Sequence, residues 1–217
     1  MGMASRKIFA AVAALIGWFA LVLQFVLLVW AAPPPHVPAG ELVIRFFSFF
    51  TILTNILIAV VLTAEALTIR SNLTARLTSP SMMTASAVYI TVVGVVYSLF
   101  LRSVWQPTGW HAVVDHSLHD VTPVMFVIFW LVFTEKSSLK WLDAFKWLVY
   151  PAAYLIYSIV RGSIVNWYPY WFADVTKLGY PQVLFNAAMV MAGFVFVGII
   201  FIAVGKVLSR TANTAAN

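Results

Sequence analysis

Six long apolar runs dominate this chain and restrict the folds that it can adopt. They lie at about residues 8–30, 46–69, 82–101, 117–133, 142–160 and 182–207. Each has roughly the length needed to cross a hydrocarbon core about 30 Å thick. Backbone groups cannot be left unpaired in lipid, and the runs lack the period-two pattern of barrel strands, so each is expected to be a helix. The sequence therefore predicts an all-α polytopic membrane protein of six transmembrane helices, with residues 1–217 forming one transmembrane domain.

The composition agrees with a membrane protein and excludes several other classes. Hydrophobic residues make up 63% of the chain and charged residues 9%, whereas a soluble domain carries about 25% charged residues. The formal net charge of +6 arises from basic residues near the ends of the apolar runs, so no nucleic-acid partner is expected. The chain has no cysteine, which excludes disulfides, thiolate metal sites and a cysteine nucleophile. The expected partner is the lipid bilayer.

The distribution of lysine and arginine predicts that both termini face the cytoplasm. The N-terminus, the second and fourth loops and the C-terminus are the richer set: Arg6, Lys7, Arg70, Arg76, Lys136, Lys140, Lys206 and Arg210. The first, third and fifth loops hold fewer: Arg45, Arg102, Arg161 and Lys177. Because cytoplasmic loops carry the excess of positive charge, the richer set marks the cytoplasmic side. The first run is too long for the apolar part of a signal peptide, so it is expected to be a retained helix.

Two polar islands interrupt the apolar runs. In the second run, Ser48, Thr51 and Asn55 have the spacing i, i+3 and i+7, which places them on one face of a helix. At the start of the fourth run, residues 115–120 hold two histidines and two aspartates. Ionisable residues in a membrane-spanning helix are functional-site candidates by default.

The two islands are expected to lie at a similar depth. At 1.5 Å per residue, Thr51 lies about 28 Å along its helix from Arg70, and His119 lies about 24 Å from Glu135. Arg70 and Glu135 both lie at the predicted cytoplasmic ends of their helices, so the two islands are expected to meet in the outer leaflet. A hydroxyl, an imidazole and a carboxylate that face one another can act as nucleophile, general base and orienting acid.

These positions define a candidate site. Thr51 is the candidate nucleophile and His119 the candidate base, with Asp115 or Asp120 to orient the imidazole. Polar groups expected at a similar level would bind substrate or hold a developing oxyanion: Asn55, Arg102, His116, Arg161, Asn166, Tyr168 and Asn186.

Simpler explanations exist for the same residues. A threonine in a membrane helix commonly bonds to a backbone carbonyl, arginines reach from helix ends to lipid phosphates, and the aromatic residues at 167–171 suit an interfacial belt. His116 and His119 lack the i, i+4 spacing of a zinc-protease helix, so no metal or other cofactor is expected. Two other hypotheses remain open: a non-catalytic binding or transport protein with a His/Asp/Arg anion or proton site, and a metal-dependent hydrolase.

Residues 46–55, 115–123, 161–162 and 167–170 together resemble the signature of a family of small bacterial integral-membrane proteins. These bacterial proteins are similar, more distantly, to the eukaryotic androgen-induced membrane hydrolases, which cleave fatty acid esters of hydroxy fatty acids with a threonine and a histidine. Thr51, behind Phe49 and Phe50, matches that threonine, and His119, ahead of Pro123, matches that histidine. The resemblance implies a lipid-ester hydrolase of the bacterial inner membrane that acts on an amphiphilic ester.

Overall fold

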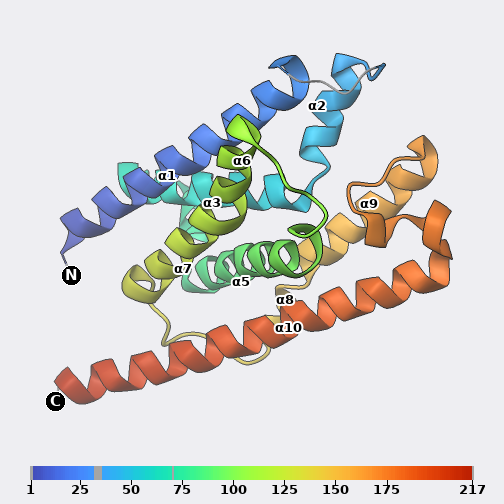
Figure 1. The fold of residues 1–217 in the computed structure, drawn as a ribbon. Coiled ribbons are helices and arrows are strands. Elements are labelled where there is room, and N and C mark those ends of the chain that lie inside the picture. The colour runs from blue at the N-terminus through green and yellow to red at the C-terminus, as the bar shows by residue number, and fades with distance from the viewer. Residues whose placement is uncertain (1, 32–35, 70, 217) are drawn as a thin grey trace. The chain divides into compact units, whose positions relative to one another are not determined.

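The protein is helical throughout the part that the structure describes. The computed structural model describes residues 2–31, 36–69 and 71–216, with side chains described up to residue 211. Within these ranges all regular elements are helices and none is a strand (Figure 1). Six of the described helices are long and apolar enough to cross a membrane. The predicted all-α, multi-pass membrane architecture is therefore confirmed, while the side on which the termini lie remains a prediction.

The six candidate spans are Met3–Ala31, Phe50–Leu67, Pro80–Leu101, Gly109–Phe133, Asp143–Val165 and Val175–Thr211. Their components, in chain order, are α1 (Met3–Val26), η1 (Leu27–Ala31), α3 (Phe50–Leu67), α5 (Pro80–Val96), η2 (Tyr97–Leu101), α6 (Gly109–His116), η3 (Ser117–Val121), α7 (Thr122–Phe133), α8 (Asp143–Lys146), α9 (Val149–Val165) and α10 (Val175–Ala216). The shorter elements between them are α2 (Ala39–Phe47), α4 (Asn72–Leu77) and the 3-10 turn η4 (Trp171–Ala173).

Two helix boundaries differ from those predicted in a way that matters for the site. The second span does not begin at residue 46, because Ser48 ends α2 and Phe49 is extended before α3 starts. Ser48 therefore belongs to a different helix from Thr51 and Asn55, and its hydroxyl donates to Ile44 O (2.7 Å). The fourth span begins at Gly109 rather than at residue 117, with glycine in the left-handed region (φ 57°). This earlier start places residues 111–116 inside the helix.

The chain forms two compact units, Met1–Ser138 and Leu139–Asn217. In the first unit, α1 packs against α3 and α7, and α5 packs against the same two helices. Small residues allow close approach between membrane helices; a Cβ atom on Gly17 of α1 would lie 3.6 Å from the Cβ atom of Ala59. Near the C-terminal end of α3, Arg6 forms an ion pair with Glu65 (2.8 Å). These contacts fix α3, which carries Thr51 and Asn55.

Three spans contain a π-turn: η1, η2 and η3. In η3 the amide of Thr122 donates to Ser117 O, five residues earlier. The residue after Thr122 is Pro123, which has no N–H to offer the carbonyl of His119 four residues earlier, and such a break in the ladder is a common cause of helix distortion. The carbonyl of His119 instead faces α5, where a Cβ atom on Gly94 would lie only 3.1 Å from it.

The second unit consists of α8, α9, η4 and α10, with both α8 and α9 packed on α10. α8 and α10 approach closely at Gly198, where a Cβ atom would lie 3.2 Å from the Cβ atom of Ala144. Gly179 has φ 73° and ψ 157°, so it separates the first turn of α10 from the remainder. Further along α10, Lys206 Nζ donates to Leu139 O (3.0 Å).

Candidate functional site

The two polar islands meet through the side chain of Asn55. This residue is fully buried in α3 (0% exposed). Its amide nitrogen donates to Thr51 O (2.9 Å) and to Leu118 O in η3 (3.3 Å). The carbonyl of Leu118 is open to this bond because the amide of Thr122, its usual partner in an α-helix, is bonded to Ser117 O in the π-turn. One nitrogen thus joins the first turn of α3 to the residue that precedes His119.

His119 is oriented by Asp115. Its Nδ1 atom lies 2.9 Å from Asp115 O and 3.3 Å from Asp115 Oδ1. The side chains of His119 and Asp115 are 14% and 8% exposed, so the pair is largely shielded. Because both partners of Nδ1 are acceptors, Nδ1 carries the proton of the neutral ring and Nε2 presents a lone pair. This is the tautomer that a general base requires.

Tyr97 completes the buried cluster from η2. Its hydroxyl donates to Asp115 Oδ2, and its ring stacks on the imidazole of His119 with centroids 3.9 Å apart and planes at 12°. Tyr97 itself is 4% exposed. We define Tyr97, Asp115 and His119 as the buried triad.

Asp120 belongs to a second, more exposed network. It accepts a hydrogen bond from Arg102 Nη2 and lies 2.8 Å from His116 Nδ1. Hydrogen bonding to Asp120 raises the pKa of the Arg102 guanidinium above its ordinary value, so Arg102 is a permanent cation. The guanidinium lies 5.0 Å from the centroid of the Tyr97 ring, so this network adjoins the buried triad.

Among the described residues, the buried polar atoms with no hydrogen-bond partner include Asn55 Oδ1 and Arg102 Nε. An unpaired buried donor or acceptor costs about 1–3 kcal/mol, more when it is charged. These atoms are therefore suited to bind polar groups of a ligand. The nitrogen of Asn55 is already engaged by two carbonyls, so among the first-unit candidates Arg102 is better placed to hold an oxyanion.

Thr51, the candidate nucleophile, is half-buried in the first turn of α3. Because Asn55 Nδ2 bonds to both carbonyls, at 2.9 Å and 3.3 Å, Thr51 O and Leu118 O lie no more than 6.2 Å apart. The backbone of Thr51 is therefore close to that of the η3 turn that carries His119.

The other four candidates lie in the second unit. Arg161 lies over the Trp167 ring (5.1 Å), and the Tyr168 ring covers Gly162, where a Cβ atom would lie 2.0 Å from Tyr168 Cε1. Burial raises the pKa of Tyr168 above its ordinary value, which keeps the phenol neutral. Asn166 ends α9 in the left-handed conformation (φ 50°).

The last of these candidates, Asn186, donates to Phe172 O (2.9 Å). Asn166 and Asn186 thus have structural roles in the second unit.

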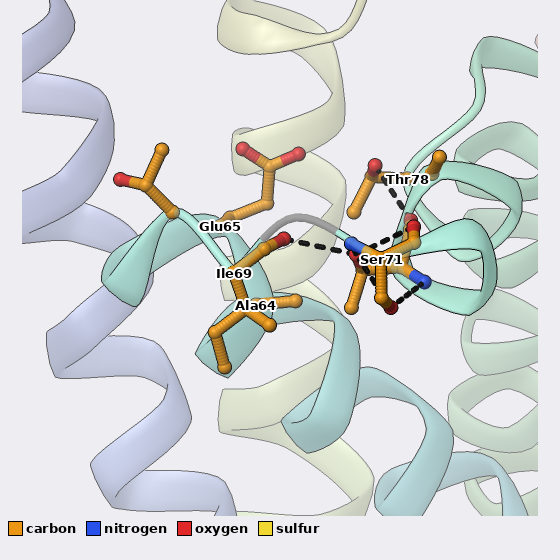
Figure 2. A pocket seen from close by; sticks show the side chains of 8 residues that line it. Ala64, Glu65, Ile69, Ser71 and Thr78 are labelled. Carbon is orange, nitrogen blue, oxygen red and sulfur yellow. Dashed lines mark hydrogen bonds between the residues drawn. The ribbon is translucent and has the colours of Figure 1, made fainter.

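A separate pocket of about 350 Å³ lies at the other end of α3 (Figure 2). Its lining consists of Ala64, Glu65, Thr68, Ile69, Ser71, Thr74, Ala75 and Thr78. It contains none of the candidate catalytic residues. In the described ranges, no three histidine, cysteine, aspartate or glutamate side chains converge to hold a metal ion.

Tyr97 is the site residue that sequence reasoning missed. A tyrosine at the outer end of an apolar run is typical of the interfacial aromatic belt, so its type alone gave no reason to choose it. A buried tyrosine hydroxyl needs a hydrogen-bond partner, and this would have pointed to Tyr97. The burial of Tyr97, however, is known only from the packing.

Comparisons with models of known protein families, with curated proteins and with solved structures found no match.

Proposed function

We propose that this protein is a membrane-embedded lipid-ester hydrolase with Thr51 as nucleophile and His119 as general base. The observation that carries the proposal is the shielded His119–Asp115 pair, joined through Asn55 to the helical turn that holds Thr51. A histidine whose Nδ1 is held by a carboxylate and whose Nε2 is unprotonated is the base of hydroxyl-nucleophile hydrolases. The resemblance of residues 46–55 and 115–123 to membrane ester hydrolases agrees with this assignment.

The proposed reaction has two half-reactions. The Thr51 hydroxyl adds to the ester carbonyl while its proton passes to His119 Nε2, and the tetrahedral intermediate then expels the alcohol, which takes that proton. Water next adds to the acyl-threonine and gives a proton to His119, and collapse releases the carboxylic acid and restores Thr51. Asp115 stabilises the imidazolium formed in each half-reaction, and Arg102 supplies positive charge to the oxyanion.

The surroundings of the site suit an amphiphilic substrate. Large apolar side chains on the two π-turn segments and the adjoining start of α7 are exposed: Leu99, Phe100, Val121 and Val124. In a bilayer such side chains face acyl chains rather than water. We therefore propose that the substrate enters sideways from the lipid, in the bacterial inner membrane, with its ester beside the triad.

A fluorophosphonate probe on detergent-purified protein tests the proposal, because it reacts covalently with activated hydroxyl nucleophiles. We expect wild-type protein to be labelled, and the label to vanish in both Thr51→Ala and His119→Ala. Thr54→Ala and His111→Ala are matched controls, since they remove the same residue types from the same spans and should leave labelling intact. Folded wild-type protein that takes up no label and cleaves no lipid ester would contradict the proposal.

A second candidate function is binding of an anionic ligand without catalysis. The buried, unpaired Nε of Arg102 is the observation that favours it. Anion binding should survive Thr51→Ala and be lost in Arg102→Ala, whereas the hydrolase proposal requires loss of activity in Thr51→Ala. Isothermal titration of both variants with a short-chain fatty acid, together with initial rates of wild type and Thr51→Ala on a lipid ester, separates the two functions.

A further inference from the structure

We propose that Tyr97 is the positioning residue that keeps the Asp115 carboxylate and the His119 imidazole in their base-competent orientation. The role of His119 as a base rests on the proposed function, whereas the contacts of Tyr97 with His119 and Asp115 do not depend on it. Tyr97 lies on a different span from the pair that it contacts, since η2 ends the third span and His119 and Asp115 lie in the fourth. Tyr97 therefore adds, from another helix, a hydrogen bond to Asp115 and a ring stacked on His119.

The first contribution is to the carboxylate. Asp115 has two oxygens: Oδ2 accepts from the Tyr97 hydroxyl, and Oδ1 lies 3.3 Å from His119 Nδ1. A carboxylate held at one oxygen has less freedom to rotate, so the other oxygen stays directed at the imidazole. Outer partners of this kind orient a histidine and set which ring nitrogen carries the proton.

The second contribution is to the plane of the imidazole. The Tyr97 ring stacks on the imidazole, with centroids 3.9 Å apart. This stacking opposes rotation about the Cβ–Cγ bond of His119, which would turn Nε2 away. The π-turn fixes Tyr97 in place, because Tyr97 O accepts the amide of Arg102 (2.9 Å). The same turn brings the Arg102 guanidinium to 5.0 Å from the Tyr97 ring. Tyr97 thus contacts the base, its orienting acid and the proposed oxyanion-binding group.

The direct test is nitrogen-15 NMR of histidine-labelled protein, with the His119 signals assigned by their loss in His119→Gln. We expect wild-type His119 to give the two separated ring-nitrogen shifts of a neutral ring protonated at Nδ1. In Tyr97→Phe, which keeps the ring and removes the hydroxyl, the Nδ1 shift should change, because the Asp115 carboxylate is released at Oδ2 and Nδ1 is left with the Asp115 backbone carbonyl as its fixed partner. Tyr89→Phe is the matched control, because Tyr89 is also buried in the third span (3% exposed), and it should leave His119 unchanged.

Kinetics supply a second readout on a lipid ester that the wild type cleaves. Tyr97→Phe should lower kcat by about 10- to 100-fold, the scale expected for a misplaced catalytic group, with KM changed less than about twofold. An unchanged His119 spectrum in Tyr97→Phe, or a loss confined to KM, would overturn the positioning role.

The two proposals can fail separately. If the wild type neither takes up the probe nor cleaves an ester, the hydrolase proposal fails, while the NMR comparison still decides the role of Tyr97. If Tyr97→Phe does not fold, the Tyr97 carbon-13 ζ resonance is compared between wild type and Asp115→Asn. A shift supports the hydrogen bond that the positioning role requires, and no shift refutes it.

Discussion

The two aspartates on the fourth span have different surroundings although both lie within one helical turn of His119. Asp115 is buried against Tyr97 and His119, whereas Asp120 faces Arg102 and the exposed His116. The sequence left open which aspartate orients the base, because i−4 and i+1 positions were both available and the start of the helix was undefined. The start at Gly109 settles the geometry by placing Asp115 inside the helix, one turn before His119.

This difference predicts unequal effects of two matched substitutions. Asp115→Asn keeps the shape of the side chain and the backbone carbonyl that accepts from Nδ1, but it removes the negative charge that stabilises the imidazolium, so ester turnover should fall by up to about 10⁴-fold, as when the orienting acid of a hydrolase is lost. Asp120→Asn loosens an exposed ion pair, which is worth about 1 kcal/mol or less, and should lower turnover less than tenfold. Initial rates on a fluorogenic ester in detergent measure both; equal losses would show that the buried partner is not the orienting one.

At the scale of helices, the sequence predicted which segments span the membrane but not their internal distortions. Apolar length identified all six spans, because lipid imposes that length on any helix that crosses it. It could not locate the break at Ser48 and Phe49, since the surrounding phenylalanines continue the apolar run. The π-turn at residues 117–121 had one visible signal, Pro123, but whether a proline yields a kink or a π-turn depends on packing, here on Gly94 of α5.

The contact at Gly94 predicts a specific sensitivity of α5. An added Cβ atom would lie 3.1 Å from His119 O and 3.6 Å from Pro123 Cβ, so Gly94→Ala should destabilise the protein by about 1–3 kcal/mol through overpacking. Gly193→Ala in α10 is the control, because apart from the adjacent residues and the local backbone of its own helix no described atom lies within 4 Å of the added carbon. There, removing the flexibility of glycine should stabilise the helix by about 0.5–1 kcal/mol. Thermal unfolding followed by circular dichroism distinguishes the two; a Gly94→Ala protein as stable as wild type would contradict the tight contact.

For the whole molecule, composition and charge predicted a multi-pass protein, but not how spans that are distant in sequence pair. Residue 55 and residue 118 come from the second and fourth spans, and hydropathy contains no information on that pairing. A shared polar character suggested that the two segments meet, and Asn55 shows how they do. The sequence contained no comparable signal for the candidates of the second unit. In the structure Asn166 ends α9 and Asn186 donates to a carbonyl of η4.

The predicted orientation of the molecule can be checked directly because the chain has no cysteine. Single cysteines are introduced at the exposed positions Ser5, Asn72 and Ser103 and treated in outer-membrane-permeabilised cells with a membrane-impermeant maleimide. The excess of basic residues at the N-terminus and in the second loop predicts that Ser103→Cys is labelled, and that Ser5→Cys and Asn72→Cys are labelled only after lysis. The reverse pattern would place the triad near the cytoplasmic leaflet.

The two hydrogen bonds that Asn55 donates also limit how the sequence of this chain can diverge. Two carbonyls on different helices share one nitrogen, so the side chain at this position must carry two hydrogens on a single atom at a fixed reach. Aspartate has no such hydrogen, serine and threonine have one, and glutamine is longer by a methylene group. Among descendants that keep the turn at residues 117–121, position 55 should therefore tolerate almost no replacement, while the lipid-facing positions around it exchange freely among apolar residues.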